Sequence, residues 1–224
     1  MNTDAATIRL RLLQLFDSQF PIGAFAHSGG LESYGQHGAD VQALRELLRN
    51  QVEWGWGRSE LAAAALAWDA AAGCDRGARL NRLSALVGSH KIVGSMRRAS
   101  ERLGRQTLKL TRRLYPGPLA SLDIQPPHHA VAVGAIGRLL DLPRRDLLLS
   151  FAHSLAAGSL AAATRCMPVS PEQTQELFVE LQPLLAAAVE IAVDASEDRL
   201  FTSTPALDVR CHQQLLLHTR LFQS

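Results

Sequence analysis

Leucine and alanine recur at intervals of three and four residues along almost the whole chain of 224 residues. Ile8, Leu12, Leu15 and Phe16 show the pattern near the start, and this spacing places apolar side chains on one face of an α-helix. No segment has the strict apolar–polar alternation of a half-buried strand. Aromatic residues make up only 5% of the chain, so the core must consist mainly of Leu, Ala and Val, and Leu and Ala favour helix. The sequence therefore predicts an all-α fold, a single-domain bundle of about ten helices.

Capping residues, glycines and prolines indicate where these helices begin and end. Asp40 and Ser170 stand at positions typical of N-caps, and Pro171 suits the first helical position. Gly55 and Gly57 are expected to kink or end the helix that follows Asp40. We expect one domain over 1–224, with a flexible N-terminus (1–5) and C-terminal tail (about 203–224). Helices are predicted at 6–19, 31–36, 40 to about 55, 59–72, 76–89, 91–115, 130–140, 144–165, 171–196 with a kink at Pro183, and 208–221, with a loop from 116 to 127.

The predicted helix from Lys91 to Tyr115 has an uneven distribution of charge. Its basic residues are spaced four, three, four and three positions apart, which aligns them in a stripe. Glu101 is the only acidic residue in this part of the sequence, while the whole chain has a net charge of only +2. We therefore interpret the stripe as a binding surface rather than only a solvated face. The basic stripe consists of Arg98, Arg102, Arg105, Lys109 and Arg112, and the buried apolar face is expected opposite it at Ile92, Met96, Ala99, Leu103, Leu110 and Leu114.

The composition argues against several classes of protein. The near-neutral net charge and the lack of a recognition motif argue against nucleic-acid binding through the basic stripe. This is the weakest of three hypotheses, the other two being a protein-binding role and a metal-dependent hydrolase. Cys74, Cys166 and Cys211 are far apart and outside any CxxC motif, which is typical of reduced cysteines in a reducing compartment. The first residues lack the features of a secretory signal, and the apolar stretches are interrupted before the ~20 residues that a bilayer requires. We expect a cytoplasmic protein.

Two groups of neighbouring residues raise the question of catalysis. His128 and His129 are adjacent, so on a helix their side chains diverge by about 100° and rarely share one metal ion. A helix cap or a packed core imidazole explains them better. His27 and Ser28 are also neighbours, but a nucleophile and its base are defined by geometry rather than adjacency. The sequence thus predicts no catalytic, cofactor-binding or metal-binding residue, and the alternative is a helical metal-dependent hydrolase that uses His128, His129 or His153.

The stretch from Leu12 to Glu32, LLQLFDSQFPIGAFAHSGGLE, resembles the N-terminal signature of the urease accessory protein UreF family. That signature is a leucine-rich helix followed by Pro-x-Gly-Ala/Gly-Phe, an aromatic residue or His, Ser, and x-Gly-Leu-Glu. Residues 94–104, 129–137 and 219–224 are similar to later family segments in the expected order. The chain departs from the pattern at His27, where Tyr is common, and at Gln223, where Arg usually stands. The chain therefore has one positive charge fewer in the C-terminal segment where the resemblance implies a partner contact.

This resemblance implies an all-α, usually dimeric scaffold that is not an enzyme and keeps no tightly bound cofactor, with nickel passing through transiently. It implies a role in nickel insertion into apo-urease. The scaffold would bridge a UreD/UreH-like accessory protein and a UreG-like GTPase, and would couple GTP hydrolysis to metal delivery. Together with the basic stripe, the resemblance places partner contacts at Pro21, Gly23, Phe25, His27, Ser28, Gly30, Glu32, Arg98, Arg102, Arg105, Arg220 and Phe222.

Overall fold

The computed structural model describes residues 4–217 and 221–222, and within these ranges no residue lies in a β-strand, which confirms the all-α fold. Two short 3₁₀ turns occur at Ala24–Ala26 and Glu197–Arg199, and a π-helical segment occurs at Gln51–Leu61. The α-helices are α1 (Ala5–Leu15), α2 (Leu31–Gln36), α3 (Val41–Asn50), α4 (Ala62–Ala70), α5 (Arg76–His90), α6 (Gly94–Leu114), α7 (Pro116–Leu119), α8 (His129–Leu139), α9 (Arg144–Cys166), α10 (Pro171–Val193) and α11 (Pro205–Gln214).

The centre of the molecule is built from small side chains. α4 and α8 form the most extensive helix–helix contact, and every residue from Ala130 to Gly137 on α8 is buried. Gly134 is the point of closest approach, because a Cβ atom there would lie only 2.0 Å from the backbone oxygen of Ala64. The alanine-rich composition therefore becomes a core in which helix backbones lie close together.

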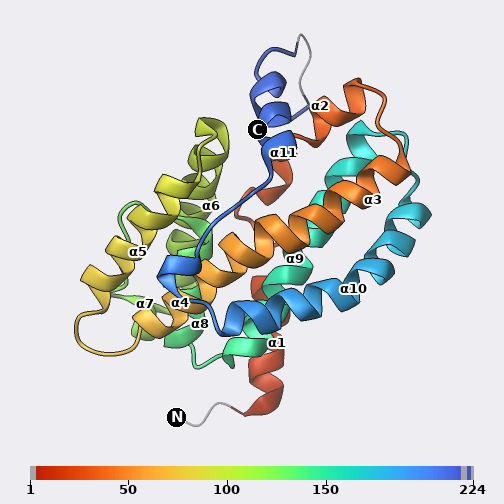
Figure 1. The fold of residues 1–224 in the computed structure, drawn as a ribbon. Helices are drawn as coiled ribbons and strands as arrows, with labels where there is room; N and C mark the ends of the chain where they lie inside the picture. The colour runs from red at the N-terminus through yellow and green to blue at the C-terminus, as the bar shows by residue number, and fades with distance from the viewer. Residues whose placement is uncertain (1–3, 218–220, 223–224) are drawn as a thin grey trace.

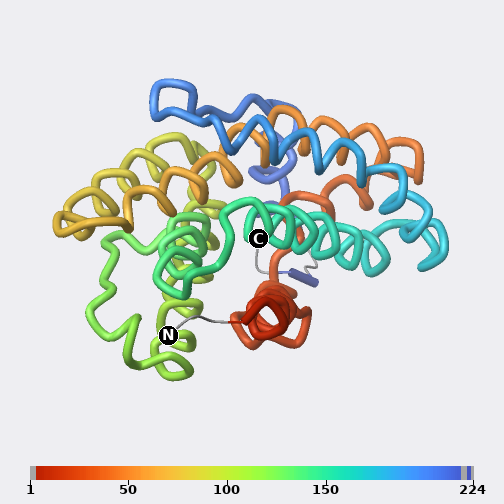
Figure 2. Tube along the Cα trace, turned by 90° about the horizontal axis from the view of Figure 1, so that it is seen from below, coloured from red at the N-terminus to blue at the C-terminus, as the bar shows by residue number. Residues whose placement is uncertain are grey.

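α9 passes through the middle of the bundle and contacts α10, α1 and α2 (Figure 2). Contrary to the expectation from sequence, α9 is long and apolar enough to cross a membrane by length and composition alone. Core helices of soluble proteins meet the same criterion, and Leu148, Phe151 and Ala156 of α9 have no exposed surface. We therefore interpret α9 as the central core helix of the bundle.

Residues 41–70 form one continuous rod across one face of the molecule (Figure 1). Gly55 and Gly57 do not end this helix, because the chain widens into the π-helical segment and continues as α4. Both glycines are buried, and a Cβ atom at Gly57 would lie 3.2 Å from the Cβ of Ala188 on α10. The glycines therefore allow close packing of α10 against the rod instead of breaking it.

The capping predictions were confirmed, whereas several predicted boundaries were wrong. The Asp40 carboxylate accepts a hydrogen bond from the Ala43 N–H, and Ser170 forms a capping box with Gln173. α1 ends at Leu15 because the Asp17 carboxylate accepts from the Gln19 N–H at 2.6 Å and closes a turn. The expected loop begins with a short helix, α7, and α11 starts at residue 205 rather than 208. α10 continues through residue 183, so the expected kink stays a prediction.

Candidate protein-binding site

The glycine-rich segment between α1 and α2 changes direction in three places. Gly23, Gly29 and Gly30 all have positive φ angles, of 83°, 59° and 91°, a backbone conformation that side chains with a Cβ rarely adopt. Gly30 precedes α2 and faces α11, because a Cβ atom there would lie 2.9 Å from the sulfur of Cys211. These glycines direct the chain over the end of the bundle and place α2 against α11.

Gln214, the last residue of α11, holds this segment in place. Its side-chain oxygen accepts hydrogen bonds from the Ser28 hydroxyl at 3.0 Å and from the Gly30 N–H at 3.1 Å. Its side-chain nitrogen donates to the Glu32 carboxylate at 3.3 Å. Only 2% of Gln214 is exposed, so these hydrogen bonds are shielded from water. Removing one partner would leave a buried polar group unsatisfied, which reduces the stability of the fold.

Glu32 connects the same segment to the end of the chain. Its carboxylate is buried and accepts hydrogen bonds from the backbone N–H groups of Leu221, at 2.6 Å, and Phe222, at 3.3 Å. The Arg165 guanidinium lies 4.3 Å from the centre of the Phe222 ring and donates to the backbone oxygen of Phe25 at 3.0 Å. We call the set of Glu32, Gln214, Arg165 and Phe222 the tail clamp.

The end of the molecule that carries the tail clamp exposes large apolar side chains. Phe25 is 73% exposed and Leu221 is 66% exposed. The chain just after α11 adds Leu215 at 45% and Leu216 at 81%. A hollow of about 420 Å³ lies beside them and is lined by Glu32, Gln36, Arg165, Cys166, Met167, Pro168 and Leu221.

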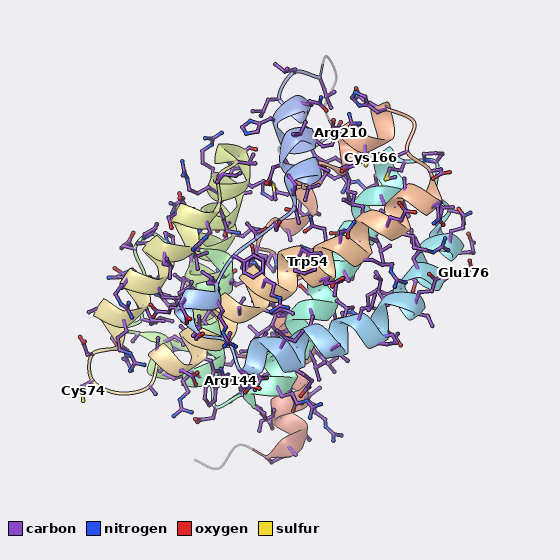
Figure 3. The ribbon with its side chains drawn as sticks, viewed as in Figure 1. Trp54, Cys74, Arg144, Cys166, Glu176 and Arg210 are labelled. Carbon is purple, nitrogen blue, oxygen red and sulfur yellow. The ribbon has the colours of Figure 1, made fainter. Side chains whose placement is uncertain are left out.

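The three cysteines do not take part in a common site. All three are free thiols. Figure 3 shows Cys166 near this end of the molecule and Cys74 at the distant loop after α4. Burial and the nearby Glu32 carboxylate raise the pKa of Cys166 to about 11, so this thiol stays protonated at neutral pH.

The basic stripe of α6 lies beside the glycine-rich segment. Burial, together with the charge of Arg102 on α6, lowers the pKa of His27. On the same helix, the end of the Met96 side chain lies 3.7 Å from the position of a Cβ atom on Gly29. Two features that the sequence suggested separately are therefore neighbours in the fold.

A family model described as UreF matches residues 39–182, which is more than half of the chain. The chain belongs to the UreF family. Three curated relatives, each named urease accessory protein UreF, are similar over nearly their whole length. The protein of Actinobacillus pleuropneumoniae serotype 3 is 31% identical over 95% of this chain and 97% of its own length. The protein of Haemophilus influenzae strain 86-028NP is 29% identical, with coverages of 95% and 94%, and that of Nostoc sp. is 28% identical, with coverages of 96% and 95%.

In this UreF-family chain the prediction that the apolar face of α6 is buried is largely wrong. Ala99 is buried, but Ile92 is 70% exposed and Leu114 is 39% exposed, while the other predicted members are half-buried. Apart from Leu108, the buried residues of α6 are small or polar instead. A Cβ atom at Gly104 would lie 1.8 Å from the backbone oxygen of Pro127, so the helix packs on the side where backbones approach most closely. The buried residues of α6 are Ser95, Ala99, Ser100, Gly104, Thr107, Leu108 and Thr111.

The basic stripe itself is exposed along most of its length. Arg98, Arg102, Arg105 and Lys109 are exposed, as predicted from their spacing. Arg112 is half-buried, because its guanidinium donates to the backbone oxygen of Leu122 and lies 3.2 Å from the Asp123 carboxylate. The exposed stripe therefore ends one residue earlier than the sequence suggested.

Apart from Arg98, Arg102 and Arg105 on α6, the predicted partner-binding residues of this UreF-family chain divide into three groups: residues with some exposed surface, one residue that the structure does not describe, and buried residues. Pro21 and Phe25 are exposed, and Gly23 and His27 are half-buried. Arg220 lies outside the described residues. The third group is buried and bound to other parts of the same chain, so its role in partner binding stays a prediction; it consists of Ser28, Gly30, Glu32 and Phe222.

Sequence reasoning did not identify Gln214 or Arg165. Neither residue belongs to a motif that spacing could reveal. Their importance comes from contacts with residues more than one hundred positions away.

The three histidines that the alternative hydrolase hypothesis would use do not lie together around one site. His128 is completely buried, and its Nδ1 atom lies 3.2 Å from the Ser100 hydroxyl. His129 packs edge-on against Phe151, with ring centres 5.4 Å apart, whereas His153 is exposed on α9. Among residues 4–217 and 221–222, no group of three or more His, Cys, Asp or Glu side chains could hold a metal ion. The geometry therefore offers nothing that favours the hydrolase hypothesis.

We expect acid to destabilise the fold through His129. Burial, with Lys91 nearby, lowers the pKa of His129 to about 4, although Glu60 partly opposes this shift. Because this folded pKa is below the ordinary histidine value of 6.5, neutral His129 stabilises the fold at neutral pH, and that stability is lost as the pH falls below 6.5. Between about pH 7 and about pH 4.5 we expect this residue to account for about 2 kcal/mol of the loss, after allowing for its partial exposure.

Urea unfolding of the parent chain and of His129→Gln at both pH values measures this contribution. The variant should lose less stability on acidification than the parent. His153→Gln, at an exposed position on α9, is the matched control and should follow the parent. Equal acid sensitivity of the parent and His129→Gln would contradict the assignment.

Proposed function

We propose that this chain is a cytoplasmic scaffold for urease maturation that promotes nickel insertion into apo-urease. In this proposal it bridges a UreD/UreH-like accessory protein and a UreG-like GTPase, works as a homodimer, and couples GTP hydrolysis to metal delivery. It acts as a binding protein rather than an enzyme, and nickel is its transient cargo rather than a resident cofactor. Membership of the UreF family, whose curated members carry the name urease accessory protein, supports the proposal.

The observation that carries the proposal is the exposed apolar end around the tail clamp. Phe25 and Leu221 leave most of their surface in water, yet their backbones are fixed by Arg165 and Glu32. A rigidly held, exposed aromatic side chain loses little conformational entropy on binding, and such residues often dominate interface energetics. This end is therefore suited to a partner protein with a complementary apolar pocket.

The basic stripe supplies a second surface beside the first. Exposed arginines at a binding surface increase the rate of encounter with an acidic partner and disfavour basic ones. Because Arg102 is close enough to His27 to influence its pKa, the two surfaces form one continuous region. One assembly could therefore contact both.

Co-purification with UreD/UreH-like and UreG-like proteins from the same source tests the proposal. We expect a defined complex by light scattering, with two copies of each chain. Phe25→Ser should weaken the complex at least about tenfold, in line with the loss of a central aromatic contact. Val179→Ser is the matched control, because Val179 is 63% exposed on α10, a helix that contributes no residue to the tail clamp. A chain that stays alone and carries stoichiometric metal would overturn the scaffold and favour the hydrolase.

A further inference from the structure

α6 presents three different faces along its length. Its small and polar residues pack against α8, and its basic stripe faces solvent. Between these two faces runs a row of apolar side chains that the bundle leaves only partly covered. We call this row the apolar strip; it consists of Ile92, just before α6, and of Met96, Leu103, Leu110 and Leu114.

The spacing of the apolar strip is that of a helix-pairing surface. Met96, Leu103 and Leu110 are seven residues apart, which is the heptad repeat that keeps a row of side chains facing one partner helix. All three are half-buried, and the strip is most exposed at its two ends, at Ile92 and Leu114. The fourteen steps along the helix from Met96 to Leu110 correspond to roughly 21 Å.

We propose that the apolar strip and the two basic residues that border it, Arg102 and Lys109, together bind an acidic amphipathic helix of a partner protein. This inference rests on the proposed function, because a scaffold requires such partners, and it specifies the form of one of them. The partner helix would place apolar residues at heptad spacing on the strip and acidic residues toward Arg102 and Lys109, which directly precede Leu103 and Leu110 in the sequence. Exposed apolar surface bordered by charge is the arrangement used for recognition of amphipathic helices.

Charge selects the partner helix over a second copy of α6. Two copies of α6 paired along their strips would bring Arg102 and Lys109 of both copies together, and like charges at close range are repulsive. Within the described ranges the structure records no ion pair for Arg98, Arg105 or Lys109. The acidic charge that would complement the stripe must therefore come mainly from another molecule.

A designed peptide tests this inference directly on the full-length chain. The probe is a fluorescein-labelled helical peptide of about 21 residues, with Leu at the heptad core positions and Glu at the flanking ones. Its control is a peptide of the same composition in scrambled order. Fluorescence anisotropy at low salt should show binding of the amphipathic peptide at least about tenfold tighter than that of the scrambled one, because only the first matches both the strip and the stripe.

Variants of the chain separate the two halves of the surface. Leu103→Ser and Lys109→Glu should each weaken binding of the amphipathic peptide at least about tenfold. The double variant Ile92→Ser/Leu114→Ser changes only exposed positions, so it tests the strip if Leu103→Ser fails to fold. The matched charge control is Arg49→Glu, an exposed arginine on α3, which should bind as the parent does. Equal binding of the scrambled peptide, or unchanged binding by the strip variants, would overturn the proposal.

The assembly of the proposed function provides an independent readout. If the parent chain forms the complex and Lys109→Glu and Ile92→Ser/Leu114→Ser form it equally well, the helix-binding inference fails and the scaffold stands. If the parent forms no complex, the scaffold fails, and the peptide measurement alone decides the inference. If the strip variants change the self-association of the chain but not peptide binding, the strip is a contact between copies and the inference is wrong.

Discussion

Gly104→Ala is expected to destabilise the fold by about 3 kcal/mol or more, the largest effect that we predict for a single methyl group. The added Cβ atom would lie 1.8 Å from the backbone oxygen of Pro127 and 2.8 Å from the backbone carbon of His128. These atoms belong to the backbone, so no side-chain rotation can relieve the overlap. α8 would have to move away from α6, and its other face carries the contact with α4 at the centre of the core.

Urea unfolding of the parent and the variant measures this effect. Gly158→Ala is the matched control, because Gly158 lies inside α9 and a Cβ atom there has no neighbour within 4 Å. In a helix interior with free space, this change should stabilise the protein by up to about 1 kcal/mol. A Gly104→Ala variant that unfolds at the same urea concentration as the parent would show that α6 and α8 can separate without cost.

Glu32→Ala is expected to release the end of the chain from the tail clamp. The substitution removes the acceptor of three N–H donors, those of Leu221, Phe222 and the Gln214 side chain. Each buried donor left without a partner costs about 1–3 kcal/mol, unless it moves into water. We therefore expect the two backbone donors to leave the site, which would also remove the Phe222 ring from Arg165.

Carboxypeptidase digestion followed by mass spectrometry detects this release. The C-terminus of Glu32→Ala should be shortened at least about tenfold faster than that of the parent, since digestion follows the population of the open form. Glu32→Gln keeps one side-chain oxygen as an acceptor and should give an intermediate rate. Glu176→Ala changes an exposed carboxylate on α10 (Figure 3) and should leave the rate unchanged. A destabilised Glu32→Ala with normal digestion kinetics would show that Glu32 supports α2 without holding the tail.

The same release should weaken the proposed assembly. Leu221 and Phe25 are held close to the tail clamp through Glu32 and Arg165, so a free tail no longer presents one ordered apolar surface. A partner must then order the tail on binding, and this ordering reduces affinity. Co-purification of Glu32→Ala with the accessory proteins should give less complex than the parent does, with Glu176→Ala again as the control.

The amino-acid sequence determined those features that depend on residues close together in the chain. Asp40 and Ser170 form the predicted caps because a cap joins a side chain to a backbone N–H only three residues away. The spacing of Arg98, Arg102 and Arg105 was sufficient to place them on one exposed stripe, because helix geometry alone fixes their relative direction. The all-α class followed in the same way from the periodicity and from the helix-favouring composition.

Only the tertiary structure decided which face of α6 is buried and what the signature residues contact. Periodicity identifies the apolar side of a helix, but α8 packs on the side of Gly104, where two backbones can approach within a distance that no larger residue permits. Glu32 and Gln214 are 182 positions apart, and their hydrogen bond exists because the fold brings α2 and α11 together. Local geometry is encoded over a few neighbouring residues, whereas contacts between distant residues depend on the packing of all the helices at once.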